Sequence, residues 1–302
     1  MLPSTFPAAI KQQVSERGSA LLIQRRDGMS WKQITWKDFE TDAESMAAFL
    51  ASGGFCAGDP AFFSPGGAYP RLVAETAVLM LGGVSVSGAP PAGAKAAFVK
   101  DREAAEAAGA DTAVYFSGAA APDGKTAGFE AAVKFGFMRR KKTRDQIREA
   151  ISSVRPEQAA FDIRDGGGAG VRTHGEFMAM LSEAAEHAGG ALGAESQCYC
   201  HLPGADIFSR VAGFLPLFVS ARWAAAEGRD EFFADILEVM PTVALVDAET
   251  VEMIARGDGG FQGFGGRLAH ILTGRAPQTD GFFTRLGVEV RELPVAPAGR
   301  KT

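Results

Sequence analysis

A glycine-rich loop holds the residues whose types and spacing come closest to a chemical site. Residues 161–174 read Phe-Asp-Ile-Arg-Asp-Gly-Gly-Gly-Ala-Gly-Val-Arg-Thr-His, and the run at 159–163 is β-prone. Such loops between a strand and a helix often wrap phosphate, because glycine lets backbone N–H groups approach the oxygens closely. This loop has no lysine and no hydroxyl among its glycines, and Asp162 and Asp165 would repel a polyphosphate. Taken alone, it favours a tight structural turn over a working phosphate cradle.

A second cluster, Cys198-Tyr199-Cys200-His201, has residue types that bind metals. On a strand, however, Cys198 and Cys200 point to one face and His201 to the other. No fourth ligand is evident nearby, so we interpret the cysteines as buried strand residues and expect no metal site. With Cys56 the cysteines are odd in number, which is typical of reduced cytoplasmic thiols.

Four histidines are the candidate general bases for an independent catalyst. No Ser or Cys motif marks a nucleophile, and the G-x-S-x-G pattern is absent. We interpret His174 as part of a helix start and His270 as part of an apolar strand. No catalytic residue is therefore predicted; the four candidates are His174, His187, His201 and His270.

Composition narrows the classes of protein further. The 302 residues are 46% hydrophobic and 22% charged, with a formal net charge of −5, which argues against nucleic-acid binding. The basic run at 139–142 is interpreted as a solvated helix entrance. No apolar segment reaches the roughly 18 to 20 residues that cross a bilayer, and no export signal is evident. We expect a cytoplasmic protein.

Strands and helices alternate along most of the chain, which predicts an α/β fold with largely parallel sheets flanked by helices. The less regular segment at 118–158 is the expected boundary between two stacked subdomains, 1–158 and 159–302. The patterns predict strands at 19–24, 29–36, 59–64, 84–86, 112–116, 159–163, 197–202, 242–246, 268–273 and 288–291, and helices at 3–16, 38–52, 70–81, 144–154, 173–186, 206–219, 231–239, 247–255 and 277–286.

The order of these elements and several sequence runs resemble the N-terminal part of the AMP-forming acyl-CoA synthetase (adenylate-forming ligase) superfamily, and within it they resemble the long-chain fatty acid CoA ligases. The likeness spans nearly the whole chain, and the order and spacing of the pieces make it specific. The matching runs are Ile34-Thr35-Trp36 with Phe39, Gly58-Asp59, 75–86, Thr173-His174, 202–210, Pro241-Thr242, 273–277, Phe282-Phe283 and Leu286-Gly287-Val288.

The resemblance implies degenerate nucleotide-site and pocket positions. The phosphate loop lacks the lysine and hydroxyls of that family, and Asp206 stands where the family has the histidine of its "LPLaH" run. Arg275 replaces a glycine expected against the adenine. The family's later elements, which include a magnesium ligand and the catalytic lysine, are not in this sequence. The nucleotide positions implied are Gly166, Gly167, Gly168, Thr173, Gly274, Ala276 and Pro277, and the substrate-pocket positions are Asp206 and Phe208.

These departures lead us to expect a truncated pseudoenzyme, inactive alone, that acts as a binding or regulatory module for an acyl chain or a partner protein. No cofactor is expected. The alternative is one half of a split long-chain fatty acid CoA ligase, completed by a separate C-terminal polypeptide; only then would ATP, Mg²⁺ and CoA be used. An uncovered sheet edge near 288–291 also suggests a homodimer.

Overall fold

The computed structural model describes residues 3–27, 29–117, 126–164, 170–202, 206–226, 228–257, 263–277 and 281–293. The predicted positions Gly166, Gly167 and Gly168 lie outside these residues. The chain forms two compact units, each built from several segments: unit 1 from Met1–Ala20, Thr35–Ala179 and Ala205–Ile207, and unit 2 from Leu21–Ile34, Met180–Gly204 and Phe208–Thr302. The division between 158 and 159 expected from the sequence stays a prediction.

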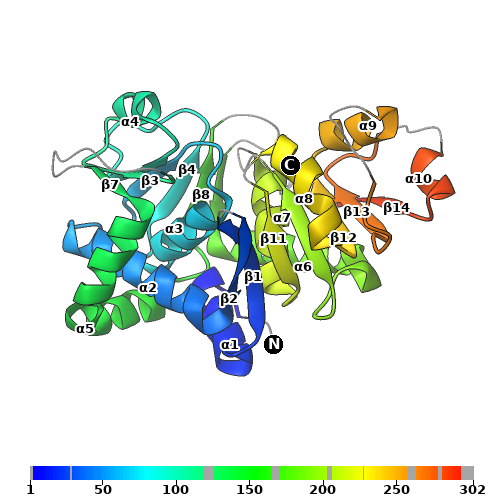
Figure 1. The fold of residues 1–302 in the computed structure, drawn as a ribbon. Coiled ribbons are helices and arrows are strands. Elements are labelled where there is room, and N and C mark those ends of the chain that lie inside the picture. Colours follow the sequence, from blue (N-terminus) through cyan, green and yellow to red (C-terminus); the bar gives the residue numbers. More distant parts are fainter. Residues whose placement is uncertain are drawn as a thin grey trace, which may run out of the picture. The chain divides into compact units, whose positions relative to one another are not determined.

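Unit 1 contains a seven-stranded sheet in the order β7-β6-β5-β3-β4-β8-β9 (Figure 1). Its pairs are parallel except for β8 and β9, which are antiparallel. All four residues of β5 are buried, as expected for a central strand covered on both faces. The strands are β3 Pro60–Phe63, β4 Val84–Ser87, β5 Ala96–Val99, β6 Thr112–Tyr115, β7 Thr126–Gly128, β8 Ala159–Ile163 and β9 Gly170–Thr173.

Helices of unit 1 begin and end at recognisable signals. A capping box of Thr35 and Asp38 starts α2, and α3 is buried from Tyr69 to Met80, as its apolar pattern predicts. Gly136 of α5 lies so close to the Ser45 carbonyl of α2 that a Cβ there would overlap it. The helices are α1 Phe6–Arg17, α2 Trp36–Ser52, α3 Ala68–Met80, α4 Arg102–Ala108, α5 Phe129–Ser153 and α6 His174–Ala188, whose second half belongs to unit 2.

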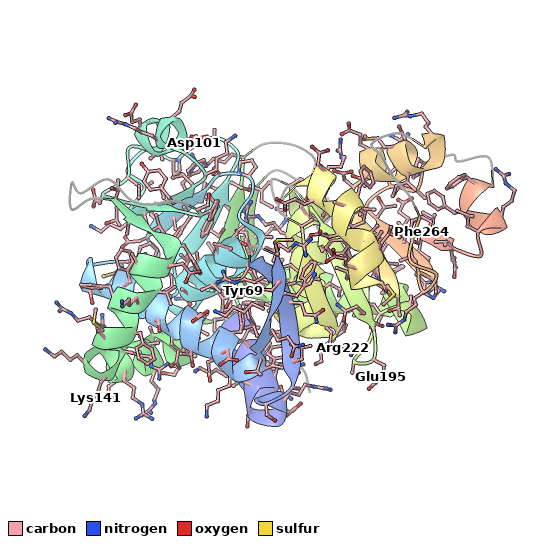
Figure 2. All side chains as sticks on the ribbon, viewed as in Figure 1. Tyr69, Asp101, Lys141, Glu195, Arg222 and Phe264 are labelled. Atoms are coloured by element: carbon pink, nitrogen blue, oxygen red, sulfur yellow. The ribbon has the colours of Figure 1, made fainter. Side chains whose placement is uncertain are left out.

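Unit 2 contains the sheet β14-β13-β12-β10-β11-β1-β2, parallel from β14 to β1. Its core gathers apolar side chains from strands and helices, including Phe264 (Figure 2). Cys198 and Cys200 are buried on β10, as predicted. The elements are β1 Leu21–Asp27, β2 Ser30–Thr35, β10 Gln197–His201, α7 Ile207–Phe218, β11 Arg222–Ala225, α8 Arg229–Val239, β12 Val243–Val246, α9 Ala248–Arg256, β13 His270–Thr273, α10 Phe282–Arg285 and β14 Glu289–Glu292, with a short 3-10 turn at Gly189–Ala191.

The α/β class is confirmed, and most strands fall where the sequence predicts them. The main error concerns α5, which was expected only at 144–154 and in fact begins at Phe129. The basic run at 139–142 therefore lies in the middle of a helix and is not a helix entrance. The strands β5, β7 and β11 and the helix α4 were not predicted, and Pro277 lies outside the short α10. No helix among the described residues is long and apolar enough to span a membrane.

Candidate functional site

Thr173, a predicted nucleotide position in unit 1, acts as a helix cap. It ends β9, and α6 begins at the next residue. The backbone N–H of Glu176 donates to the Thr173 hydroxyl at 3.2 Å, and the Thr173 N–H donates to the Glu176 carboxylate at 2.8 Å. This reciprocal arrangement is a capping box, and the carboxylate also complements the positive end of the helix dipole. A phosphate at this place would have to displace Glu176.

The next residue, His174, is fully buried at the start of α6. Neither of its ring nitrogens has a hydrogen-bond partner among the described residues, although its backbone N–H donates to Gln158 at 2.9 Å. Burial lowers the pKa of His174 to about 4, because the charged imidazolium cannot be solvated there. The side chain is therefore neutral at pH 7, in line with a packing role at a helix start.

Beside the glycine loop, at the end of β8, an acidic and a basic side chain pair with each other. The Nε of Arg164 donates to the Asp162 carboxylate at 2.9 Å, and the Arg164 N–H donates to the Ser87 carbonyl at 3.0 Å. The guanidinium that could have offset the missing lysine is engaged by a carboxylate of the chain itself. Asp165 lies outside the described residues.

In unit 2, the nucleotide positions follow β13. The ring of Phe208 lies against Gly274: a Cβ on that glycine would be 2.8 Å from the ring. The N–H of Ala276 donates to the Glu292 carboxylate at 3.4 Å, and the buried Thr273 hydroxyl donates to a carbonyl at 3.4 Å. Of the predicted positions, the structure thus brings Phe208 and Gly274 together, and it engages the Ala276 donor with an internal carboxylate.

The remaining predicted positions flank α7 and follow β13. Asp206 is half-buried directly before α7 and belongs to unit 1, whereas Phe208 belongs to unit 2. Pro277 is half-buried, and Arg275 is exposed, so its side chain points away from the core. The predicted positions therefore fall into two sets, one in each unit.

Sequence reasoning missed a charged cluster at the carboxyl ends of β10 and β12, where the strand order of unit 2 reverses. Such reversals are common ligand sites in α/β sheets. Here Arg229 makes two hydrogen bonds to the Glu249 carboxylate, at 3.2 and 3.0 Å, and lies 3.7 Å from Asp247. Burial lowers the pKa of the nearby His201. The cluster joins the first turns of α8 and α9, and its positive charge is balanced internally.

The sequence carries a signal for two of these internal contacts. The spacing Thr173-x-x-Glu176 is the signature of a capping box. Asp247 directly precedes α9 and accepts from the Thr250 N–H at 2.7 Å, which is a typical N-cap. No sequence pattern of this kind indicates that the Glu292 carboxylate accepts from the Ala276 N–H. Among the described residues, no group of three or more His, Cys, Asp or Glu side chains is placed to hold a metal ion.

Comparison with known proteins supports the fold. No protein-family model and no curated protein matches the chain. Several solved structures do match it. VinN is 14% identical to this chain with a TM-score of 0.68, and the match covers 95% of this chain and 73% of VinN. A Mycobacterium tuberculosis fatty acyl CoA synthetase is 12% identical with a TM-score of 0.69, and the match covers 95% of this chain and 58% of the synthetase. The adenylation domain of a keto acid-selecting NRPS module is 14% identical with a TM-score of 0.71, and the match covers 96% of this chain and 59% of that structure's chain.

At these identities the likeness defines the fold alone. The chain has the α/β fold of the N-terminal domain of acyl-CoA synthetases and of the related adenylation domains. Depending on the structure compared, it covers 53 to 76% of the length of the similar chain. The resemblance seen in the sequence is therefore confirmed at the level of the fold.

Proposed function

We propose that this domain retains the scaffold of adenylate-forming enzymes without carrying out ATP-dependent acyl adenylation alone, and that it acts as a binding or regulatory module. The supporting observation is that internal carboxylates already engage the backbone donors at two of the predicted nucleotide positions. Glu176 holds the Thr173 N–H, and Glu292 holds the Ala276 N–H. A nucleotide phosphate would meet the negative charge of Glu176 at the first place, and an adenine base would find the donor already engaged at the second.

The energetics of the reaction make this arrangement unfavourable for catalysis. Acyl adenylation brings a carboxylate against the α-phosphate of MgATP, so catalysis depends on cations and N–H donors that neutralise the developing charge. Removing one such donor typically costs about 2 to 4 kcal/mol of transition-state stabilisation. In this chain the loop lacks lysine, and Arg164 pairs with Asp162. Several of these losses act together.

An acyl chain that carries no nucleotide is the ligand class that we propose for the module. Among the similar structures, one fatty acyl-adenylate ligase is in complex with acyl adenylate and pyrophosphate, and VinN is in complex with L-aspartate. The aromatic ring of Phe208 over Gly274 would offer an apolar wall to an acyl group, while it occupies the space over the glycine that a base would need.

Isothermal titration of the chain with MgATP and with a non-hydrolysable acyl-AMP analogue tests the proposal. We expect no heat of binding from either ligand at micromolar concentration. The triple variant Phe208→Ala, Arg275→Gly and Glu292→Gln is the matched comparison, because it removes the groups that cover or charge the positions after β13. Micromolar binding of either ligand to the unmodified chain contradicts the proposal.

The second candidate is one half of a split AMP-forming long-chain fatty acid CoA ligase, which would use ATP, Mg²⁺ and CoA. It is favoured by the match of 95% of this chain to 58% of the fatty acyl CoA synthetase. Mixing the chain with a separate C-terminal domain of such a synthetase should then give acyl-CoA, detected by mass spectrometry. Absence of product with the mixture, while the intact synthetase is active, rules against this candidate.

The homodimer, the partner protein and the cytoplasmic location stay predictions. Light scattering at micromolar concentration tests the first directly: a dimer mass is expected, and a monomer mass contradicts it.

A further inference from the structure

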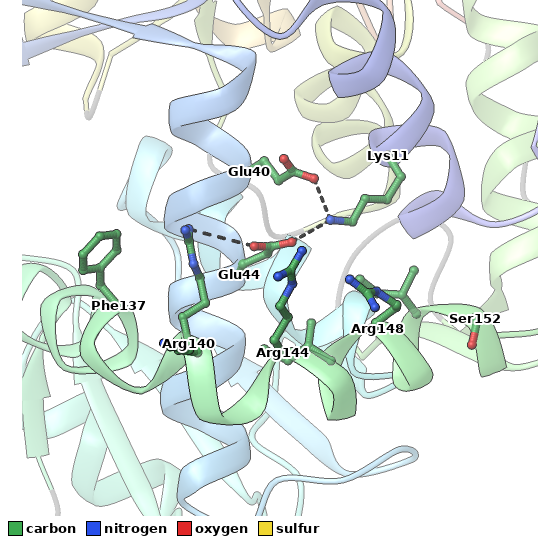
Figure 3. A pocket seen from close by; sticks show the side chains of 11 residues that line it. Lys11, Glu40, Glu44, Phe137, Arg140, Arg144, Arg148 and Ser152 are labelled. Atoms are coloured by element: carbon green, nitrogen blue, oxygen red, sulfur yellow. Dashed lines mark hydrogen bonds and ion pairs between the residues drawn. The ribbon is translucent and has the colours of Figure 1, made fainter.

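Unit 1 contains a cleft of about 940 Å³ between α5 on one side and α1 and α2 on the other (Figure 3). Its lining includes basic side chains from α5, whose seven basic residues stand against three acidic ones. The close approach of Gly136 to the Ser45 carbonyl, together with buried Ile147, fixes α5 against its neighbours. The cleft contains none of the predicted nucleotide positions, so a ligand bound there is independent of the proposed function.

Four of the charged side chains that line the cleft balance one another. The ammonium of Lys11 lies 2.6 Å from the Glu40 carboxylate and 2.7 Å from that of Glu44. Arg140 approaches Glu44 at 3.9 Å (Figure 3). These two cations and two carboxylates are partly buried and pair with each other, so together they offer no net charge to a ligand.

The other basic side chains that line the cleft, all from α5, are different. Within the described parts of the chain, neither Lys141 nor Arg144 has an ion-pair partner within 4 Å, and Arg148 has only the exposed Asp145 at 3.7 Å. Lys141 lies on the exposed side of α5 (Figure 2). Of these three cations that line the cleft, only Arg148 has a carboxylate of the described residues within 4 Å. This local charge is opposite in sign to the net charge of the whole chain, −5.

Apolar side chains lie among these cations. Phe137 is 56% exposed, and the guanidinium of Arg140 lies 5.2 Å from the centre of its ring. Ile147 and Ile151 also line the cleft. A ligand that entered would meet guanidinium groups suited to bidentate contact with phosphate, next to an apolar surface. Inorganic phosphate would use only the first of these features.

We propose that the cleft between α1, α2 and α5 binds a phosphate-bearing amphiphile, with the phosphate held by Lys141, Arg144 and Arg148 and the apolar part against Phe137, Ile147 and Ile151. The phosphate belongs either to a lipid headgroup in a bilayer or to a soluble ligand; the chemistry at the cleft is the same. Attraction acts at short range, because salt screens exposed charges beyond about 8 Å at physiological ionic strength.

Isothermal titration measures the binding of dihexanoyl phosphatidic acid, kept below the concentration at which it forms micelles, to the full chain. Inorganic phosphate is titrated in the same way as a probe that carries the charge without the apolar part. The cleft variant is Arg144→Gln with Arg148→Gln. The matched control is Arg139→Gln with Lys142→Gln, which removes the same charge from the same helix outside the lining of the cleft. Circular dichroism and thermal unfolding establish that both variants are folded.

We expect saturable binding of the phosphatidic acid that is tighter than that of phosphate. The cleft variant should bind about tenfold more weakly or worse, and the control less than about threefold more weakly. Absence of saturable binding, equal loss in both variants, or equal affinity for phosphate and the amphiphile overturns the proposal.

Vesicle sedimentation separates the two sources of phosphate. Vesicles of phosphatidylcholine alone are compared with vesicles of phosphatidylcholine and phosphatidylglycerol in equal parts. Sedimentation with the second kind only, lost in the cleft variant and kept in the control, identifies a bilayer lipid. Binding of the soluble amphiphile without sedimentation identifies a soluble ligand; both results support the cleft. Sedimentation lost equally in both variants overturns it, because diffuse helix charge would then explain it.

Discussion

Two places in the molecule differ from the cleft beside α5 in whether their donors already have partners. These places are the start of α6 and the segment that follows β13. At the first two places the donors are engaged by carboxylates of the chain, Glu176 and Glu292. In the cleft, Lys141 and Arg144 have no ion-pair partner within 4 Å in the described part of the chain. Residue type alone therefore does not make an anion site. A donor is available to a ligand only where the fold has not already supplied its partner.

The largest expected effect concerns a buried ion pair, the extreme case of an engaged donor. Arg71 donates through Nε to Glu75 at 3.2 Å and through a terminal nitrogen to the Ser64 carbonyl at 3.2 Å, and Ser85 also donates to Glu75. Burial lowers the pKa of Arg71 to about 9. Arg71→Met leaves the Glu75 charge buried without its main partner, which should cost about 3 to 5 kcal/mol in the free energy of unfolding.

The matched variant for this prediction is Arg144→Met in the open cleft. Because Arg144 is exposed, the change should stay within about 0.5 kcal/mol. Urea unfolding followed by circular dichroism measures both variants. Equal effects of the two substitutions would remove the distinction between engaged and open donors.

How far the sequence predicts the fold depends on the element. The runs at 59–64 and 242–246 are apolar and bounded by turn residues, and both are strands. In contrast, Ala96-Ala97-Phe98-Val99 was missed because alanine gives little strand signal, although pairing with β3 and β6 makes it a central strand. The first half of α5 was missed because Gly136 weakens helix propensity, and only packing against α2 explains that glycine.

The candidate sites divide in the same way. The cap at Thr173 depends on residues three apart and could be read from the sequence. The bond from Ala276 to Glu292 could not, because it depends on the pairing of β13 with β14. The basic run of α5 was visible, but its neighbours from α1 and α2 were not, since Lys11 and Glu44 are distant in sequence. Strand register and helix packing between residues that are distant in sequence are therefore what the sequence patterns do not provide.

The imidazole of His174 represents a third case. It has no hydrogen-bond partner in the described residues, and it is also buried and therefore not accessible to a ligand. Its pKa is about 4 in the folded chain and near 6.5 in an unfolded one. Between these pH values the unfolded state binds more protons, so stability falls as the pH is lowered from 6.5 towards 4. The slope should reach about 1.4 kcal/mol per pH unit at most.

Replacing His174 by leucine should remove this part of the pH dependence, because leucine has no proton to bind and needs no hydrogen bond. The control is His187→Gln on the exposed side of the same helix. Urea unfolding at several pH values between 4 and 7 measures the slope for each chain. If the slope persists in His174→Leu and disappears in the control, the assignment to His174 is wrong.

The smallest effect tests the capping box itself. Glu176→Ala removes the acceptor for the Thr173 N–H and should lower the free energy of unfolding by about 1 kcal/mol. Glu176→Gln keeps an acceptor and loses only the charge, worth about 0.3 to 1 kcal/mol at a helix N-terminus. Thermal unfolding ranks the two. The charge-neutral Glu176→Gln chain should also bind pyrophosphate no more weakly than the parent, because a repelling carboxylate is gone. If Glu176→Ala is as stable as the parent, the Thr173 donor is not engaged in solution, and the α6 start becomes as open as the cleft beside α5.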